Sequence, residues 1–189
     1  MEFNNDTEKC LEVLQDGGII LYPTDTIWGI GCDATNEAAV AKIYQLKNRP
    51  DEKSMIILLA DVKDINRYVT QPNPAVYDFI QQTKKPTTII YNGPVGLADN
   101  LISKENTIAI RIVNDAFCKH LIKRFRKPIV STSANLSGNP SPATFSAIDE
   151  AIKNGVDYIV QHRQNDLTPA EPSAIVILNT DGSFNVIRS

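Results

Sequence analysis

The sequence predicts an α/β fold: a single domain over residues 1–189, built on an open, twisted, mixed β-sheet flanked by helices. Short apolar runs, typical of buried strands, alternate with amphipathic helical patterns through most of the chain. The last expected strands follow one another almost directly, which favours a mixed sheet over a purely parallel one. A chain of 189 residues can bury a substantial core without disulfides or metal. No repeat, low-complexity tract or domain boundary interrupts the pattern.

The first half of the chain opens with a helix and a strand. Asn5 or Asp6 can cap the helix, and Gly17 can end it. The apolar run at 19–22 predicts a buried strand that ends at Pro23. The further elements expected here are a helix capped by Thr35 or Asn36, a strand at 55–59, and helices at 62–68 and 74–82, the last of which buries Val76, Phe79 and Ile80.

The second half is richer in strands. A strand at 87–91 ends at the turn signal Asn92-Gly93-Pro94, and an ordered loop follows as far as residue 105. Asp115 caps a helix whose C-terminal end is basic. The remaining expected elements are strands at 107–113, 129–131, 158–161, 174–178 and 184–187, and a helix capped by Thr144 or Ser146.

Composition and cysteine usage exclude several classes of protein. The net charge of −3 disfavours a dedicated nucleic-acid binder. No apolar run reaches the roughly 20 residues of a membrane helix. The polar, acidic N-terminus does not resemble a signal peptide, so a cytoplasmic protein is expected. Cys10, Cys32 and Cys118 show no C-x-x-C spacing, which excludes a structural zinc site. They are expected to be core thiols, with a catalytic Cys32 as the less favoured alternative.

Polar residues that follow two of the expected strands predict a ligand site. Thr24-Asp25-Thr26 follows the first strand, and Lys47 and Arg49 come after the next helix, so together they supply parts of a pocket for an anion. The alternative is that both cations are solvated charges at a helix end. No G-x-S-x-G surrounds Ser133, so Ser133 and Asn135 are interpreted as neutral hydrogen-bonding groups at a strand end. A turn bonded to its own backbone is the alternative for that pair.

Four stretches together resemble one family: YPTDTIWGIG at 22–31, KNRP at 47–50, TIAIR at 107–111 and STSANLSG at 131–138. The family is the YrdC-like L-threonylcarbamoyladenylate synthases. The likeness runs from about Gly17 to Arg188, in the family's order and spacing. It implies an open α/β fold around a central electropositive cavity.

The resemblance also implies a nucleotidyltransferase reaction. L-Threonine, bicarbonate and ATP would give L-threonylcarbamoyl-AMP, pyrophosphate and water, with Mg²⁺ carried by the triphosphate and no metal site in the protein. A threonylcarbamoyl-transferase complex would then use the product for t6A modification at position 37 of ANN-decoding tRNAs, and direct contact with tRNA or double-stranded RNA is possible. Two alternatives stay open: a YciO-like paralogue, and a non-catalytic module that binds double-stranded RNA or tRNA.

The residue roles that the resemblance implies fall into three sets. The catalytic set is Lys47, Arg49, Ser133 and Asn135. The ATP-binding set is Lys47, Arg49, Lys53, Thr107, Ser133, Asn135, Ser141 and Arg188. The threonine-binding set is Thr26, Leu58, Arg111, Ser131 and Ser173. The sequence departs from the family pattern at Leu58, where many members carry histidine, at Lys53, often asparagine, and at Ala174, more usually threonine.

Overall fold

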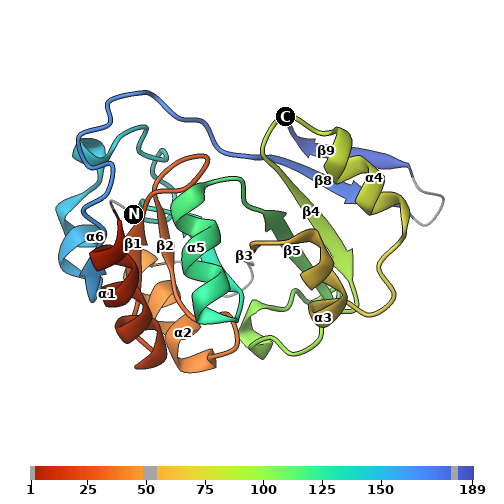
Figure 1. Ribbon diagram of the computed structural model, residues 1–189, viewed down its shortest axis with the longest axis horizontal. Helices are drawn as coiled ribbons and strands as arrows, with labels where there is room; N and C mark the ends of the chain where they lie inside the picture. Colours follow the sequence, from red (N-terminus) through yellow and green to blue (C-terminus); the bar gives the residue numbers. More distant parts are fainter. Residues whose placement is uncertain (1–2, 49–54, 180–182) are drawn as a thin grey trace.

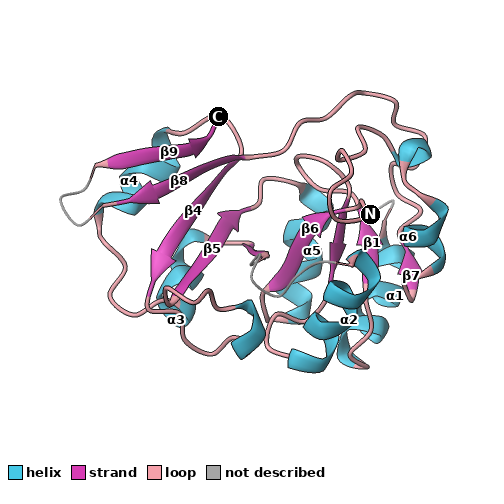
Figure 2. Ribbon diagram, turned by 180° about the vertical axis from the view of Figure 1, so that it is seen from behind, coloured by secondary structure: helices cyan, strands magenta, loops and turns pink. Residues whose placement is uncertain are grey.

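One nine-stranded sheet runs through the described part of the chain, which in this computed structural model is residues 3–48, 55–179 and 183–189 (Figures 1 and 2). The strand order is β7-β1-β2-β6-β3-β5-β4-β8-β9. The pairs β1–β7, β3–β5 and β4–β8 are parallel and the other pairs are antiparallel, so the expected mixed sheet is confirmed. The strands are β1 (Ile20–Tyr22), β2 (Gly29–Gly31), β3 (Ile56–Leu59), β4 (Thr87–Asn92), β5 (Thr107–Ile112), β6 (Ile129–Ser133), β7 (Tyr158–Ile159), β8 (Ala174–Leu178) and β9 (Phe184–Arg188).

Strand β5 shows how the sequence gives the sheet two different faces. Successive side chains of a strand point to opposite faces. In β5, Ile108 and Ile110 therefore point into the core, and Arg111 points to the other face. The strand register places Leu58 opposite Arg111 and Ser131 opposite Ile56, so these residues share the face of Arg111. The outcome is one face of apolar side chains and one face that carries small and polar side chains as well.

Helices α4 and α5 lie on the same side of the sheet, as the views from front and back show (Figures 1 and 2). Helix α5 packs against α1, where Phe117 and Phe3 make an edge-to-face contact with ring centroids 5.5 Å apart. The helices are α1 (Asn4–Gln15), α2 (Glu37–Lys47), α3 (Ile65–Tyr68), α4 (Ala75–Gln82), α5 (Ala116–Phe125) and α6 (Glu150–Asn154), with short 3₁₀ turns at Val62–Asp64, Asp99–Leu101 and Phe145–Ala147. Within the described residues, none of the helices has the length and apolar character needed to span a bilayer.

The predicted cap of the first helix is wrong. Helix α1 begins at Asn4, and neither Asn5 nor Asp6 caps it. The buried carboxylate of Asp6 instead accepts hydrogen bonds from the Tyr158 hydroxyl at 2.6 Å and from the backbone N–H groups of Gln161 and His162, both at 2.9 Å. Three hydrogen bonds from distant donors stabilise this carboxylate more than one bond to a helix N–H group would. Asp6 therefore links α1 to β7 and the segment that follows it.

Strand β2 was not predicted, because two of its three residues are glycines and glycine disfavours strands. Close packing explains their presence. A Cβ atom on Gly31 would lie 2.5 Å from the Val130 carbonyl oxygen and 2.7 Å from a ring carbon of Tyr22, so no side chain fits there. Strand β6 also continues two residues beyond the expected end at Ser131, and Ser133 is therefore a strand residue.

Other local expectations have mixed outcomes. Asn36 and Asp115 are confirmed as caps of α2 and α5. The helix expected after Thr144 or Ser146 is a 3₁₀ turn followed by α6, which Asp149 caps through its bond to the Ala151 N–H. In α4 only Val76 is fully buried, while Phe79 and Ile80 stay partly exposed.

The three cysteines are buried, as expected for core thiols. Desolvation raises the pKa of the Cys10, Cys32 and Cys118 thiols above the ordinary range. A nucleophilic cysteine needs an accessible thiolate. The structure therefore gives no support to the alternative of a catalytic Cys32.

Replacing Asp6 with alanine is expected to lower the free energy of unfolding by roughly 2–4 kcal/mol, because a hydroxyl and two backbone N–H groups lose their buried acceptor. Urea denaturation at an unchanged m-value measures this loss. Asp99 is exposed, so Asp99→Ala is a matched control with an expected change within about 0.5 kcal/mol. Equal losses in the two variants would contradict the assigned role of Asp6.

Candidate active site

A cavity of about 200 Å³ opens on the small-residue face of the sheet. Within the described chain, two guanidinium groups and no carboxylate contribute to its walls. Seven of the sequence-predicted site residues line it: Thr26, Arg111, Ser131, Ser133, Ser141, Ser173 and Arg188. The structure thus gathers residues from β5, β6, β9 and three loops around one space.

Glycine and serine at the centre of the sheet make room for this cavity. Gly29 of β2 lies directly opposite Ser133 of β6. A Cβ atom on Gly29 would sit 3.1 Å from the Ser131 hydroxyl oxygen, so a larger residue would displace that hydroxyl. Gly29, one of the two glycines that prevented the prediction of β2, therefore helps to form the cavity wall.

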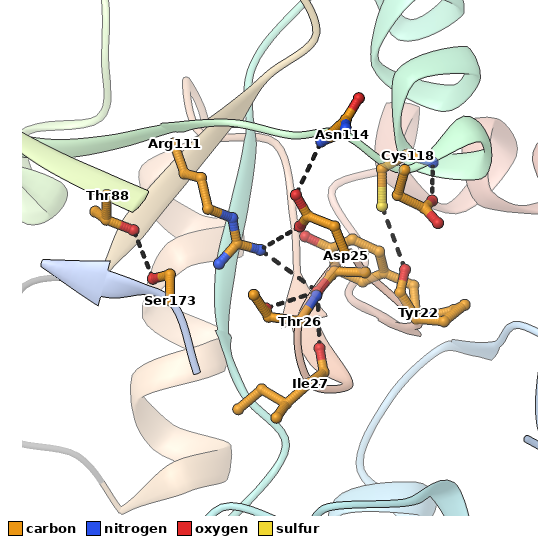
Figure 3. Close-up of polar contacts among 12 residues, drawn as sticks. Tyr22, Asp25, Thr26, Ile27, Thr88, Arg111, Asn114, Cys118 and Ser173 are labelled. Carbon is orange, nitrogen blue, oxygen red and sulfur yellow. Dashed lines mark hydrogen bonds and ion pairs between the residues drawn. The ribbon is translucent and has the colours of Figure 1, made fainter. Parts of the chain in front are cut away.

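Arg111 is the most buried charge in the cavity wall, with 3% of its surface exposed. Its Nη2 atom lies 3.1 Å from Asp25 Oδ1 and 3.4 Å from the Thr24 hydroxyl (Figure 3). Among the described residues its Nε has no hydrogen-bond acceptor. A buried donor without a partner is rare in native proteins. One edge of the guanidinium is therefore held by the protein, while the buried Nε donor is left without an acceptor among the described residues.

Asp25 is a site residue whose role sequence analysis did not assign. Its Oδ2 atom accepts a hydrogen bond from the Asn114 N–H at 2.8 Å, while Oδ1 faces Arg111 (Figure 3). This two-sided contact fixes both the carboxylate and the guanidinium. The available signal was an acidic residue inside a loop of hydroxyl residues that is expected to bind an anion, because such a residue requires a nearby cation.

The loop after β1 is fixed by its own hydrogen bonds. The Thr24 hydroxyl accepts from the Thr26 N–H at 3.0 Å and donates to the Ile27 carbonyl at 2.8 Å. From a distant loop, the Arg163 guanidinium donates to the Thr24 carbonyl at 3.0 Å and pairs with Asp115 at 3.3 Å. The Thr26 hydroxyl consequently stands at the cavity wall on a preformed turn.

Ser173 and Arg188 form the side of the cavity near the end of the chain. The hydroxyls of Ser173 and Thr88 share a hydrogen bond of 2.8 Å (Figure 3). Arg188 donates from Nε and Nη2 to the Ser173 carbonyl, at 3.1 and 2.8 Å. Desolvation, together with the like charge of Arg111, lowers the pKa of Arg188 below its usual value. The two cations on this cavity repel each other. An anionic ligand bound between them would stabilise both positive charges.

Lys47 is not a solvated charge, so that alternative is wrong for this residue. It ends α2 with only 1% of its surface exposed, and its Nζ donates to the carbonyl oxygens of Ser133 and Asn135. It does not line the cavity. Lys47 instead fastens the end of α2 to the segment that carries Ser133. Arg49 and Lys53 lie outside the described residues.

Three further predicted residues lie near the cavity without lining it. Asn135 donates to the carbonyl oxygens of Leu136 and Asn139 at 3.0 and 2.7 Å, the contacts of a turn that is bonded to its own backbone. Leu58 lies beside Arg111 but is completely buried. Thr107 lies at the other end of β5 from Arg111, roughly 13 Å away at about 3.3 Å per residue. Its hydroxyl shares a hydrogen bond with Ser103.

No cluster of three or more potential metal-ligating side chains occurs among the described residues. Ile27, Trp28 and Pro172 line the cavity although sequence analysis did not single them out as site residues. Ile27 and Trp28 belong to the quoted stretch at 22–31, which was the available signal for them. The cavity therefore combines two cations and several hydroxyls with an apolar rim.

Comparison with known proteins shows which family has this sequence and fold. A sequence model of the Sua5/YciO/YrdC family, described as telomere recombination, matches residues 12–189. A threonylcarbamoyl-AMP synthase of Stenotrophomonas maltophilia is 33% identical over 187 residues, which cover 96% of this chain and 97% of that protein.

Solved structures agree with the sequence match. P. abyssi Sua5 complexed with L-threonine superposes with a TM-score of 0.84 at 21% identity, over 96% of this chain and 53% of Sua5. The chain thus spans about half the length of that protein. E. coli YciO superposes with a TM-score of 0.84 at 23% identity, over 98% and 89% of the two chains. The family match covers nearly the whole sequence, and the chain belongs to the Sua5/YciO/YrdC family.

Proposed function

We propose that this protein is an L-threonylcarbamoyladenylate synthase, which converts L-threonine, bicarbonate and ATP into L-threonylcarbamoyl-AMP, pyrophosphate and water. The observation that carries the proposal is the buried, incompletely paired guanidinium of Arg111 in a cavity whose described walls hold no carboxylate. The name of the Stenotrophomonas relative and the L-threonine bound to P. abyssi Sua5 support this choice of substrate.

The amino-acid substrate is assigned to the Arg111 side of the cavity. A planar guanidinium matches a carboxylate, and Arg111 keeps donors free for one. The neutral hydroxyls of Thr26, Ser131 and Ser173 surround the same space and can bond the amine and hydroxyl of threonine. Leu58 lies in the second layer beneath this region, so we propose for it a packing role beside Arg111 and no direct contact with threonine.

The nucleotide is assigned to the cations and hydroxyls around the rest of the cavity. Arg188, Ser133 and Ser141 line it, and Lys47 holds the segment that carries Ser133. Thr107, on the same sheet face but at the far end of β5, suits the distal part of a long ligand such as ATP. The resemblance adds Arg49, Lys53 and Asn135 to this set. Mg²⁺ is proposed to arrive on the triphosphate, since the described cavity wall offers no carboxylate for it.

The proposed chemistry needs no protein nucleophile. The threonine nitrogen attacks the carbon of bicarbonate, and loss of water gives a carbamate. A carbamate oxygen then attacks the α-phosphorus of ATP, the bond from that phosphorus to the bridging oxygen breaks, and pyrophosphate leaves. Such transfers depend on positioning and on stabilising charge. The arginines and preformed hydroxyls of this cavity supply both.

The product is proposed to pass to a threonylcarbamoyl-transferase complex for t6A formation in tRNA, in the cytoplasm. A YciO-like paralogue is the second candidate, because E. coli YciO shares the fold over nearly its full length. A non-catalytic RNA-binding module is disfavoured by the net charge of −3. The reaction itself distinguishes these candidates.

The purified protein is expected to release pyrophosphate from ATP only when L-threonine and bicarbonate are both present. A pyrophosphate assay with each substrate omitted in turn measures this dependence, and mass spectrometry with labelled bicarbonate identifies the product. Pyrophosphate release that is unchanged without threonine would refute the proposed reaction.

Arg111→Lys is expected to raise the KM for threonine by at least about tenfold, because lysine keeps the charge but loses the planar two-donor geometry. The KM for ATP should change much less. Arg67→Lys, at an exposed position outside the cavity, is the matched control and should leave both constants unchanged. An unaltered threonine KM in Arg111→Lys would exclude the carboxylate assignment.

Arg188→Gln is expected to raise the KM for ATP by about tenfold, since one cation near the triphosphate is lost. Arg188 is an exposed residue of the edge strand β9, and glutamine can still donate a hydrogen bond to the Ser173 carbonyl, so the fold should tolerate the change. Steady-state kinetics in ATP, with Arg67→Gln as control, measures the effect. If the threonine KM rose instead while the ATP KM stayed constant, Arg188 would belong to the amino-acid site.

A further inference from the structure

A second cavity, of about 480 Å³, lies on the opposite face of the sheet from the candidate active site. Its floor includes Ile89 of β4 and Ile110 of β5, the sequence neighbours of Thr88 and Arg111. Because side chains alternate along a strand, this floor and the Arg111 side chain lie on opposite sides of the same strands. Helices α4 and α5 flank the cavity on this side of the sheet (Figure 1).

The floor of the second cavity is apolar, and polar side chains make up much of the rest of its lining. Ile89 and Ile110 are almost completely buried, at 1% and 2% exposed. The partly exposed Phe79 and Ile80 of α4, together with Ile112 of β5, extend this surface to the opening. Removing apolar surface from water contributes about 25 cal/mol per Å². An apolar group that entered the cavity would cover the side chains that α4 leaves open to solvent.

The rim of the second cavity is positively charged. Lys84 and Lys85 precede β4 and are exposed, and no described carboxylate pairs with either of them. Lys119 of α5 stands at the rim as well, where its Nζ donates to the Asn114 side-chain oxygen at 2.8 Å. Asp25 is the one carboxylate that the described residues contribute to the lining, and it already pairs with Arg111. The net charge of the lining therefore favours an anion.

We propose that this cavity is a second ligand site, and that it takes an organic anion with an aliphatic or aromatic body. The volume falls within the range of about 300–1,000 Å³ that is typical of small-molecule sites. The apolar body lies against the partly exposed Phe79, Ile80 and Ile112. The anionic group lies at the rim beside Lys84 and Lys85. The site goes beyond the proposed synthase activity and does not depend on it.

Decanoate, at concentrations below micelle formation, is a suitable probe, and 1-decanol and decyltrimethylammonium are its neutral and cationic counterparts. Isothermal titration calorimetry is expected to show one decanoate site per chain, bound at least about tenfold more tightly than decyltrimethylammonium. Saturating L-threonine and ATP should leave the stoichiometry unchanged, since they are assigned to the other face. Equal affinity for all three probes, or displacement of decanoate by threonine and ATP, would overturn the proposal.

The lysine rim provides a matched pair of variants. Lys84→Ala/Lys85→Ala is expected to weaken decanoate binding at least about fivefold while leaving pyrophosphate release unchanged. Lys63→Ala/Lys123→Ala removes the same charge from exposed positions outside this cavity and should leave binding unaltered. All four side chains are exposed, so folding is not at risk, and thermal melting verifies it. If decanoate binding weakened equally in both double variants, the effect would come from net charge alone, and the proposed site would be refuted.

Discussion

A buried positive charge constrains the whole candidate site. Placing a guanidinium in a protein interior costs several kcal/mol unless charge and hydrogen bonds compensate it. At Arg111 the protein compensates in part, through Asp25, which the Asn114 N–H in turn holds in place. Arg188 does not contribute to this compensation. It carries a second positive charge on the same cavity, and the two like charges repel each other. The charge that the protein leaves uncompensated favours an anion in this cavity, which is the basis of the ligand proposed above.

Side chains along β4 and β5 alternate between the two faces of the sheet, and this alternation separates the buried arginine from the apolar core. Thr88 and Arg111 point to the hollow face, while Ile89 and Ile110 point to the face on which α4 and α5 lie. A shift of one residue in register would exchange the two sets and bury the arginine in the apolar layer. The sheet can therefore carry one cavity beside Arg111 on one side and a second cavity over Ile89 and Ile110 on the other.

The strands and caps with purely local signals were predictable, and features that depend on distant partners were not. The alternation over residues 107–113 predicted β5, and the family resemblance assigned Arg111 to threonine binding. Strand β2 escaped prediction, because Gly29 and Gly31 suit close packing against β6 and disfavour an isolated strand. Asp6 was misassigned as a cap for a related reason: its three donors come from the far end of the chain. Asp25 shows the same limit, because a local sequence pattern does not reveal a pairing with a strand encoded much later.

Lys47 shows why neither of the two interpretations of its sequence was sufficient. A helix-end cation was expected either to touch the ligand or to be solvated, yet it is buried and donates to the carbonyl oxygens of Ser133 and Asn135. These contacts hold the backbone of β6 at the position where the Ser133 side chain enters the cavity wall. Asp25 acts on Arg111 in a comparable way from behind the opposite wall. The buried charges of Lys47 and Asp25 thus hold the backbone and the guanidinium of the candidate site in place. The residues that line the cavity between the two arginines can therefore be short and neutral.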